Sequence, residues 1–153
     1  QARLGLSLAL LTGVTVEVWQ SPIRTEPFDG VPAIYSLLTE SPGVMLVEAP
    51  FYPPEAVFEN GEYVLNATRH WQPVMNGTSG ATPMSYRRRA ESFWYFPRDW
   101  AIAAMKKEGA THVMVHLERF GPEAPDVLKA LAGRQDLQLL GADGKGHRLY
   151  KFK

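Results

Sequence analysis

The stretch Val44-Met45-Leu46-Val47-Glu48-Ala49-Pro50 decides the fold class. It is a continuous apolar run closed by an acidic residue and a proline, without the alternation of polar and apolar side chains that a sheet with one solvated face shows. A run of this kind is typical of a strand that is covered on both faces. It therefore predicts a three-layer domain with this strand in the central sheet.

The sequence that precedes this strand predicts its partner in the sheet. Residues 13–19 are rich in β-branched and aromatic side chains and predict a buried first strand. Residues 31–38 carry apolar side chains at helical spacing after Asp29, and the helix should end by Gly43. Strand, helix and strand in this order form a βαβ unit, so the strands over 14–19 and 44–48 should be parallel.

The downstream sequence completes the expected sheet. Residues 97–109 predict a helix, 111–117 the clearest strand of the chain, and 122–133 a further helix. Residues 137–141 and 147–152 predict a hairpin. The fold class is therefore α/β, a three-layer domain with a mixed, partly parallel central sheet and a C-terminal β-hairpin. Residues 51–98 are the least regular part, where we expect a functional site.

Length and composition exclude several classes of protein. The chain has 153 residues, which suits one domain. Its 16 basic and 16 acidic residues balance, whereas nucleic-acid binders usually carry a basic excess, so no nucleic acid is expected as a partner. The absence of cysteine excludes disulfides and thiolate sites.

The amino-terminal segment is predicted to lie outside the domain core. Residues 4–16 are mostly apolar but fewer than the roughly 20 that span a bilayer. For residues 4–11, the tail of a membrane helix, the hydrophobic part of a signal segment and a strand all stay open. Because the chain starts at Gln1, we expect residues 1–12 to be the remnant of a membrane-proximal or upstream segment and 13–153 to be a single α/β domain.

No catalytic or metal-binding motif is found. His112 and His116 have the spacing of paired metal ligands on a helix, but on a strand they would lie about 13 Å apart. We therefore predict that these histidines serve packing, and we expect no metal ligands, no cofactor and no catalytic residues in this chain.

The segment 69–80 is the candidate ligand-binding loop. It combines a ring, an imidazole, an amide and a hydroxyl beside glycine backbone, a mixture that suits a polar ligand with ring faces. The alternative is a structural loop whose His70 and Asn76 satisfy buried backbone groups. The predicted ligand-binding residues are His70, Trp71, Asn76, Gly77, Ser79 and Tyr86.

The phrase His70-Trp71-Gln72-Pro73-Val74-Met75-Asn76-Gly77-Thr78-Ser79-Gly80 resembles the extracytoplasmic C-terminal region of bacterial polytopic membrane proteins of the GT-C glycosyltransferase type, the dolichyl- or polyprenyl-phosphate-mannose mannosyltransferase-like group. The strand ending in Glu48-Ala49-Pro50, the helix leading into residues 111–117 and the closing hairpin also fit. The resemblance implies an extracytoplasmic domain on the outer side of a bacterial membrane, joined to the membrane-embedded part of the same polypeptide. It also implies that the catalytic carboxylate lies elsewhere in such enzymes.

Three functions remain open from the sequence. The first is an accessory domain that supports the membrane catalytic part or positions a saccharide or lipid-linked sugar. The second is a free-standing carbohydrate-binding module. The third is an autonomous hydrolase with Glu48 and either His70 or His116 as acid and base, which we disfavour because no such pair is encoded close together.

Overall fold

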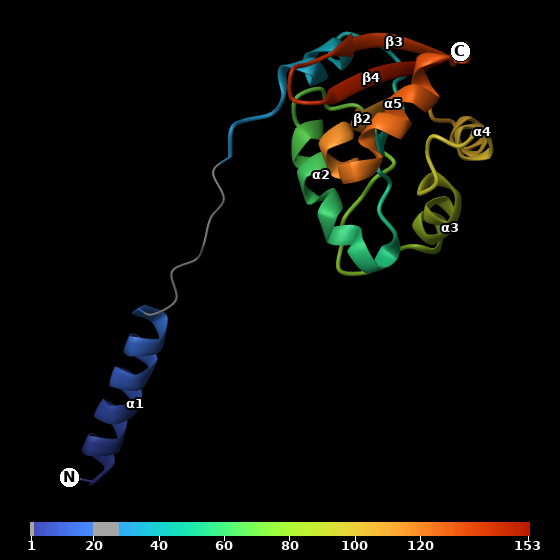
Figure 1. Ribbon diagram of the computed structural model, residues 1–153. Coiled ribbons are helices and arrows are strands. Elements are labelled where there is room, and N and C mark those ends of the chain that lie inside the picture. The colour runs from blue at the N-terminus through green and yellow to red at the C-terminus, as the bar shows by residue number, and fades with distance from the viewer. Residues whose placement is uncertain (1, 20–27) are drawn as a thin grey trace. The chain divides into compact units, whose positions relative to one another are not determined.

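The computed structural model describes residues 2–19 and 28–153 of the chain. Two compact units are found, residues 1–30 and residues 31–153. In the first unit the described structure is mainly helix α1 (Ala2–Trp19), and the second unit holds the sheet and all other helices (Figure 1). The boundary between the two compact units falls at residue 30.

Helix α1 replaces the strand that was predicted over residues 13–19, and that prediction is wrong. The hydroxyl groups of Ser7, Thr12 and Thr15 donate to carbonyl oxygens four residues earlier, at 3.0, 2.9 and 2.8 Å. These polar side chains are therefore satisfied inside a helix, and the helix-forming residues 4–11 extend into the β-branched stretch. In the two described ranges, no helix combines the length and apolar character needed to span a bilayer.

The second unit contains a four-stranded mixed sheet in the order β1-β2-β4-β3. Its strands are β1 (Leu46–Ala49), β2 (His112–His116), β3 (Leu137–Ala142) and β4 (His147–Phe152). Strands β1 and β2 are parallel, whereas β4 is antiparallel to both β2 and β3. The mixed sheet and the C-terminal hairpin are confirmed, but the parallel pair joins β1 to β2 because residues 14–19 are helical.

Two hydrophobic clusters show that the sheet is covered on both faces. On one face Val47, Val113 and Tyr150 pack with α3 (Met84–Phe93), α4 (Asp99–Lys107) and α5 (Ala124–Ala132). On the other face Leu46, Met114 and Leu149 pack with the short 3-10 helix η1 (Ala33–Leu38). Alternate residues of each strand face opposite clusters, as the period of a strand requires, so the three-layer prediction holds.

The connection from β1 to β2 contains helices that the sequence did not predict. These are η2 (Pro54–Asn60), α2 (Gly61–Ala67) and α3. Pro53 and Pro83 stand immediately before two of them, so these prolines mark helix starts and not an irregular segment. Helices α4 and α5 agree with prediction, and a further 3-10 segment, η3 (Leu117–Glu123), follows β2 directly.

Candidate functional site

A buried polar cluster occupies the carboxyl ends of the parallel strands β1 and β2. Glu48 and His116 are both fully enclosed, and His116 Nε2 lies 2.8 Å from Glu48 Oε2. The Tyr35 hydroxyl donates to both Glu48 oxygens at 3.1 Å and lies 3.3 Å from His116 Nε2. The amide of Asn66 donates to the Tyr35 oxygen at 3.4 Å. The fold therefore brings together an acid–base pair whose members lie far apart in the sequence.

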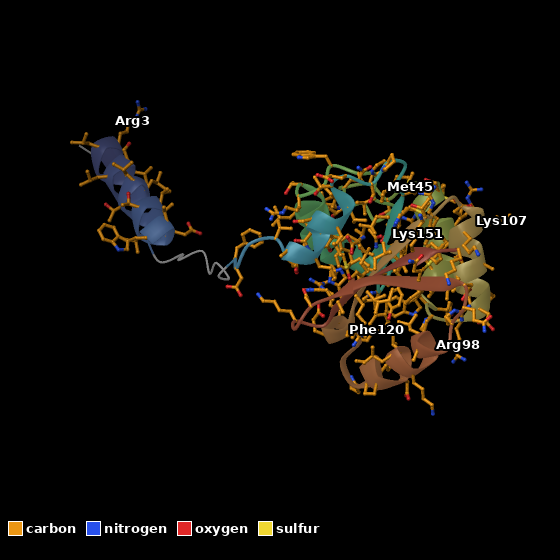
Figure 2. All side chains as sticks on the ribbon, turned by 90° about the horizontal axis from the view of Figure 1, so that it is seen from above. Arg3, Met45, Arg98, Lys107, Phe120 and Lys151 are labelled. Atoms are coloured by element: carbon orange, nitrogen blue, oxygen red, sulfur yellow. The ribbon has the colours of Figure 1, made fainter. Side chains whose placement is uncertain are left out.

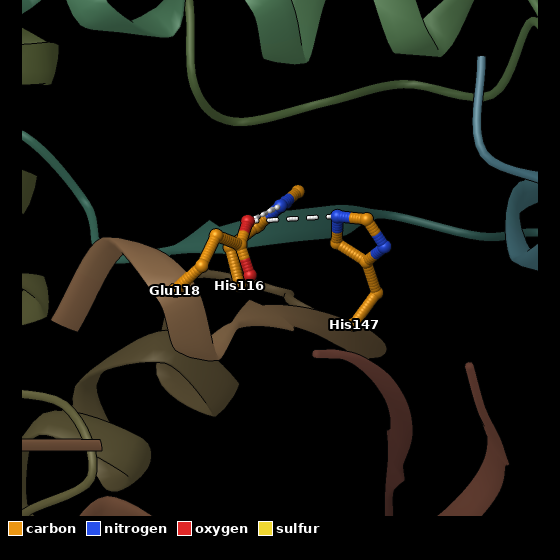
Figure 3. Close-up of side chains that lie close together, drawn as sticks. All are labelled: His116, Glu118 and His147. Atoms are coloured by element: carbon orange, nitrogen blue, oxygen red, sulfur yellow. Dashed lines mark ion pairs between the residues drawn. The ribbon is translucent and has the colours of Figure 1, made fainter. Parts of the chain in front are cut away.

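The cluster continues from His116 towards the surface along β4. Glu118 Oε1 lies 3.4 Å from His116 Nδ1 and 3.5 Å from His147 Nε2, so one carboxylate lies between two imidazoles (Figure 3). His147 Nδ1 in turn lies 2.6 Å from Asp143 Oδ2. The three carboxylates alternate with the two imidazoles from the protein interior to the hairpin turn.

The electrostatics of the cluster follow from this alternation. Burial alone lowers the pKa of His116, but the contacts with Glu118 and Glu48 outweigh it and raise the pKa to about 9. The contact with Glu118 also raises the pKa of His147. Burial raises the pKa of Glu118, but its contacts with His116 and His147 prevail and hold it well below its usual range. Burial and the charge of Glu48 raise the pKa of Tyr35, which stays a neutral hydrogen-bond donor.

Enclosure limits what the Glu48–His116 pair can do chemically. A general acid and base must reach the proton that they transfer in a bound substrate. Neither side chain has exposed surface. The Glu48–His116 pair therefore serves as an internal ion pair more readily than as hydrolytic machinery.

Asn76 and His70, two of the predicted ligand-binding residues, lie in the protein interior. Asn76 is 1% exposed; its Oδ1 accepts a hydrogen bond from the Glu48 N–H at 2.8 Å and its Nδ2 donates to the Glu48 carbonyl at 3.0 Å. The His70 ring stacks on Tyr35 with centroids 5.8 Å apart, and its Nδ1 accepts from the Gln72 N–H. Burial lowers the pKa of His70. Both side chains hold backbone and core in place.

The other four predicted residues are divided between interior and surface. Tyr86 is buried; its hydroxyl donates to the Tyr52 carbonyl at 2.6 Å and accepts from Asn60 Nδ2 at 2.7 Å. The Gly77 carbonyl accepts from the same Asn60 amide at 3.0 Å. Trp71 is 82% exposed and Ser79 is also exposed. The structure thus joins Asn76, Gly77 and Tyr86 through Asn60, and leaves Trp71 outside this group.

An aromatic cleft of about 800 Å³ lies at the same ends of β1 and β2, on the sheet face covered by α3, α4 and α5. Arg98 and Phe120, which both line it, lie on the α5 side of the sheet (Figure 2). The Arg119 guanidinium reaches the Tyr52 hydroxyl at 3.2 Å and contacts Glu62. The principal ring and charged residues of the lining are Tyr52, Trp94, Tyr95, Phe96, Arg98, Arg119, Phe120, Glu123 and Asp126.

Sequence reasoning missed this cleft and most of the polar cluster. One signal was present for the cluster, because Glu48 is a charged residue inside an otherwise apolar strand and such residues are rarely buried without a partner. A second signal needed the sheet register, in which His116 and His147 are cross-strand neighbours. The cleft residues come from three separate stretches of the sequence, so no local motif indicates them.

Comparison with known proteins adds no further constraint. No family model matches the chain, and neither a curated protein nor a solved structure of significant similarity is found. The functional argument therefore depends on the geometry of the two sites.

Proposed function

We propose that residues 31–153 form a saccharide-binding accessory domain of a membrane glycosyltransferase-like protein. The single observation that carries the proposal is the aromatic cleft at the carboxyl ends of β1 and β2. Ligands of open α/β sheets commonly bind outside these strand ends. The volume of about 800 Å³ lies within the range of small-molecule sites and accommodates an oligosaccharide fragment.

The chemistry of the lining favours a neutral sugar. Trp94 and Tyr95 are about half exposed and offer ring faces on which the C–H faces of a sugar stack. Two guanidiniums, from Arg98 and Arg119, and two carboxylates, from Glu123 and Asp126, supply donors and acceptors for hydroxyl groups without a net charge. An anionic ligand would favour an excess of basic residues, which this lining lacks.

In this proposal the domain works on the extracytoplasmic face of a membrane, and the membrane-embedded part of the same polypeptide carries the catalytic residues. The apolar surface of α1 supports such an attachment, because nine large apolar side chains of this helix are exposed: Leu4, Leu6, Leu8, Leu10, Leu11, Val14, Val16, Val18 and Trp19. A free-standing carbohydrate-binding module would use the same cleft but would not need α1. The hydrolase alternative is disfavoured by the enclosure of Glu48 and His116.

The test is a titration of the full chain with neutral di- and trisaccharides of glucose, mannose and N-acetylglucosamine, followed by tryptophan fluorescence. We expect Trp94→Ala and Tyr95→Ala each to weaken binding about tenfold, since a lost stacking ring costs about 1 kcal/mol beyond its buried area. Trp71→Ala is the matched control, because Trp71 is exposed and lies outside the cleft lining.

Two results would redirect or end the proposal. If Trp71→Ala abolishes binding and Trp94→Ala does not, the site is the loop of residues 70–80 that the sequence indicated. If none of these sugars perturbs the fluorescence, the cleft does not bind neutral saccharides.

A further inference from the structure

Three side chains of metal-ligating type converge where β2, η3 and β4 meet. His116 ends β2, Glu118 follows two residues later, and His147 begins β4 directly opposite His116 in the antiparallel register. In the described ranges 2–19 and 28–153, this is the one group of at least three such residues whose ligand atoms all lie within 4.8 Å of one another. The fold itself, and not a local sequence motif, brings the three together.

The distances are close to those of a coordination shell. Glu118 Oε1 lies 3.4 Å from His116 Nδ1 and 3.5 Å from His147 Nε2 (Figure 3), and the three atoms all lie within 4.8 Å of one another. Ligand atoms about 2.0–2.2 Å from a tetrahedral metal ion lie about 3.3–3.5 Å from each other. The two distances from Glu118 Oε1 match this spacing, and the two imidazole nitrogens lie within 4.8 Å of each other.

The far nitrogen of each imidazole is held by a carboxylate. His116 Nε2 contacts Glu48 Oε2 at 2.8 Å, and His147 Nδ1 contacts Asp143 Oδ2 at 2.6 Å. Asp143 is itself fixed, because its Oδ1 accepts hydrogen bonds from the His147 and Lys145 N–H groups, both at 2.9 Å. Metal-ligating histidines almost always have such an outer partner, which sets the tautomer and turns the other nitrogen towards the metal.

The surroundings of His116 Nδ1 also support the site. This nitrogen is fully buried and makes no well-formed hydrogen bond; its polar contact is the ion pair with Glu118 Oε1 at 3.4 Å. A buried polar atom without a partner is costly, and native structures rarely leave one without a reason. The atom lies on the side of the ring that faces Glu118, and a metal ion bound there would replace the proton that this imidazole holds in the metal-free protein.

We propose that His116 Nδ1, Glu118 and His147 Nε2 bind a divalent transition metal ion of the zinc class, with Glu48 and Asp143 as the outer partners that orient the imidazoles. Two imidazoles and one carboxylate suit zinc, whereas calcium and magnesium prefer shells of oxygen ligands. Glu118 is partly exposed, so the fourth position opens to solvent and takes a water molecule. This departs from the expectation from sequence that no metal ligands are present.

Backbone packing explains why the hairpin turn can approach this site. Gly146 has a φ of 96°, and its carbonyl accepts a hydrogen bond from the Leu117 N–H at 3.1 Å. A Cβ at residue 146 would lie 3.1 Å from Glu118 Oε2. The positive φ of the turn favours a glycine at this position, and a larger residue would also move the Glu118 carboxylate slightly.

The experiment uses the full chain after treatment with a chelator and dialysis. We expect zinc sulfate to bind with a stoichiometry of one per chain in calorimetry and to raise the melting temperature, and cobalt(II) to give the visible absorption of a tetrahedral site. Glu118→Gln and His147→Ala should weaken zinc binding at least about tenfold, and Asp143→Asn, which keeps both histidines, by about 10 to 100-fold.

The matched control is His112→Gln on the same strand. His112 is also buried, but its Nδ1 contacts the Thr111 hydroxyl and it lies outside the three-residue group, so zinc binding should not change. Circular dichroism of each variant separates loss of binding from loss of folding, and Glu118→Gln, at a partly exposed residue, keeps the test independent of folding. The proposal is overturned if zinc gives neither heat nor a melting shift, or if Glu118→Gln and Asp143→Asn bind zinc as tightly as the wild type.

Discussion

At the scale of the residue, Asn76 illustrates how a residue that suggests ligand binding can be fully used by the fold. Its side-chain amide pairs with both backbone groups of Glu48 and so continues the pairing of β1 beyond the sheet. The sequence indicated that the segment around Asn76 was unusual and left a structural loop as the alternative. It did not indicate the partner, because Glu48 lies 28 positions away and only the folded chain brings the two together.

We predict that Asn76→Ala destabilises the domain by about 2 to 5 kcal/mol, since two buried backbone groups lose their partners at about 1 to 3 kcal/mol each. Urea unfolding followed by circular dichroism measures the free energy. Ser79→Ala, at an exposed position of the same segment, should change it by less than about 0.5 kcal/mol. An Asn76→Ala variant as stable as the Ser79→Ala variant would show that water replaces the amide.

Tyr35 makes a second residue-scale prediction. Its hydroxyl contacts both oxygens of Glu48, and its ring packs with the cluster of Leu38, Leu46 and Met114. Tyr35→Phe keeps the ring and removes the donor, so we expect a loss of about 1 to 3 kcal/mol in unfolding free energy. Tyr95→Phe, at an exposed ring, is the control and should be neutral. Equal stability of the two variants would mean that Glu48 does not depend on the tyrosine hydroxyl.

At the scale of the element, the sequence was informative where both faces of a strand are covered by other elements. The runs at 44–48 and 111–117 lack a polar face because both faces are covered, and this pattern identified β1 and β2. The same reasoning failed at residues 13–19, where β-branched side chains occur in a helix without a sheet partner. Intrinsic strand propensity differs by only about 1 kcal/mol between residue types and depends on contacts with neighbouring strands. Where no neighbouring strand is present, it therefore cannot decide between strand and helix.

Connections between elements offer a prediction of pH dependence. Arg134, between α5 and β3, forms a two-pronged pair with Asp136 at 2.9 and 2.8 Å and reaches Asp99 at the start of α4 at 2.6 Å. The hydrogen bonds from Arg134 lower the pKa of Asp136 from its ordinary value of 3.8. The Arg134–Asp136 pair therefore stabilises the folded state at pH values above the unfolded-state pKa of 3.8. This contribution to the unfolding free energy is lost as the pH falls through the lower pKa that Asp136 has in the folded state.

Asp136→Asn should accordingly reduce the unfolding free energy by less than about 1 kcal/mol at neutral pH, because the pair is partly exposed. The difference from the wild type should stay constant down to about pH 5 and shrink below about pH 4. Thermal melts across this range measure it, with Glu91→Gln on α3 as an exposed carboxylate control. If the difference in unfolding free energy between Asp136→Asn and the wild type grows as the pH falls, the stabilising role of the Arg134–Asp136 pair is contradicted.

At the scale of the whole molecule, the two units have different surface chemistry. Residues 31–153 enclose two hydrophobic clusters around a sheet, as a folded domain does. Helix α1 instead exposes its apolar side chains and has two charged residues, Arg3 and Glu17. Exposed apolar surface of this extent usually has a covering partner. The proposed function supplies one, because a domain joined to a membrane-embedded part would have apolar surface or lipid beside α1.

We therefore predict that the full chain associates with phosphatidylcholine vesicles through α1, and that the double variant Leu8→Asp, Leu11→Asp reduces the bound fraction in flotation at least about tenfold. Burying one leucine side chain is worth about 1.5 to 3 kcal/mol, and a carboxylate adds a further cost in lipid. The control is Val64→Asp, Leu65→Asp on α2, whose side chains are also partly exposed but belong to the second unit. If both double variants float as the wild type does, α1 makes no lipid contact. If the wild-type chain itself does not float with the vesicles, the exposed face of α1 needs a protein partner. Attachment to a membrane-embedded part must then be tested with that part present.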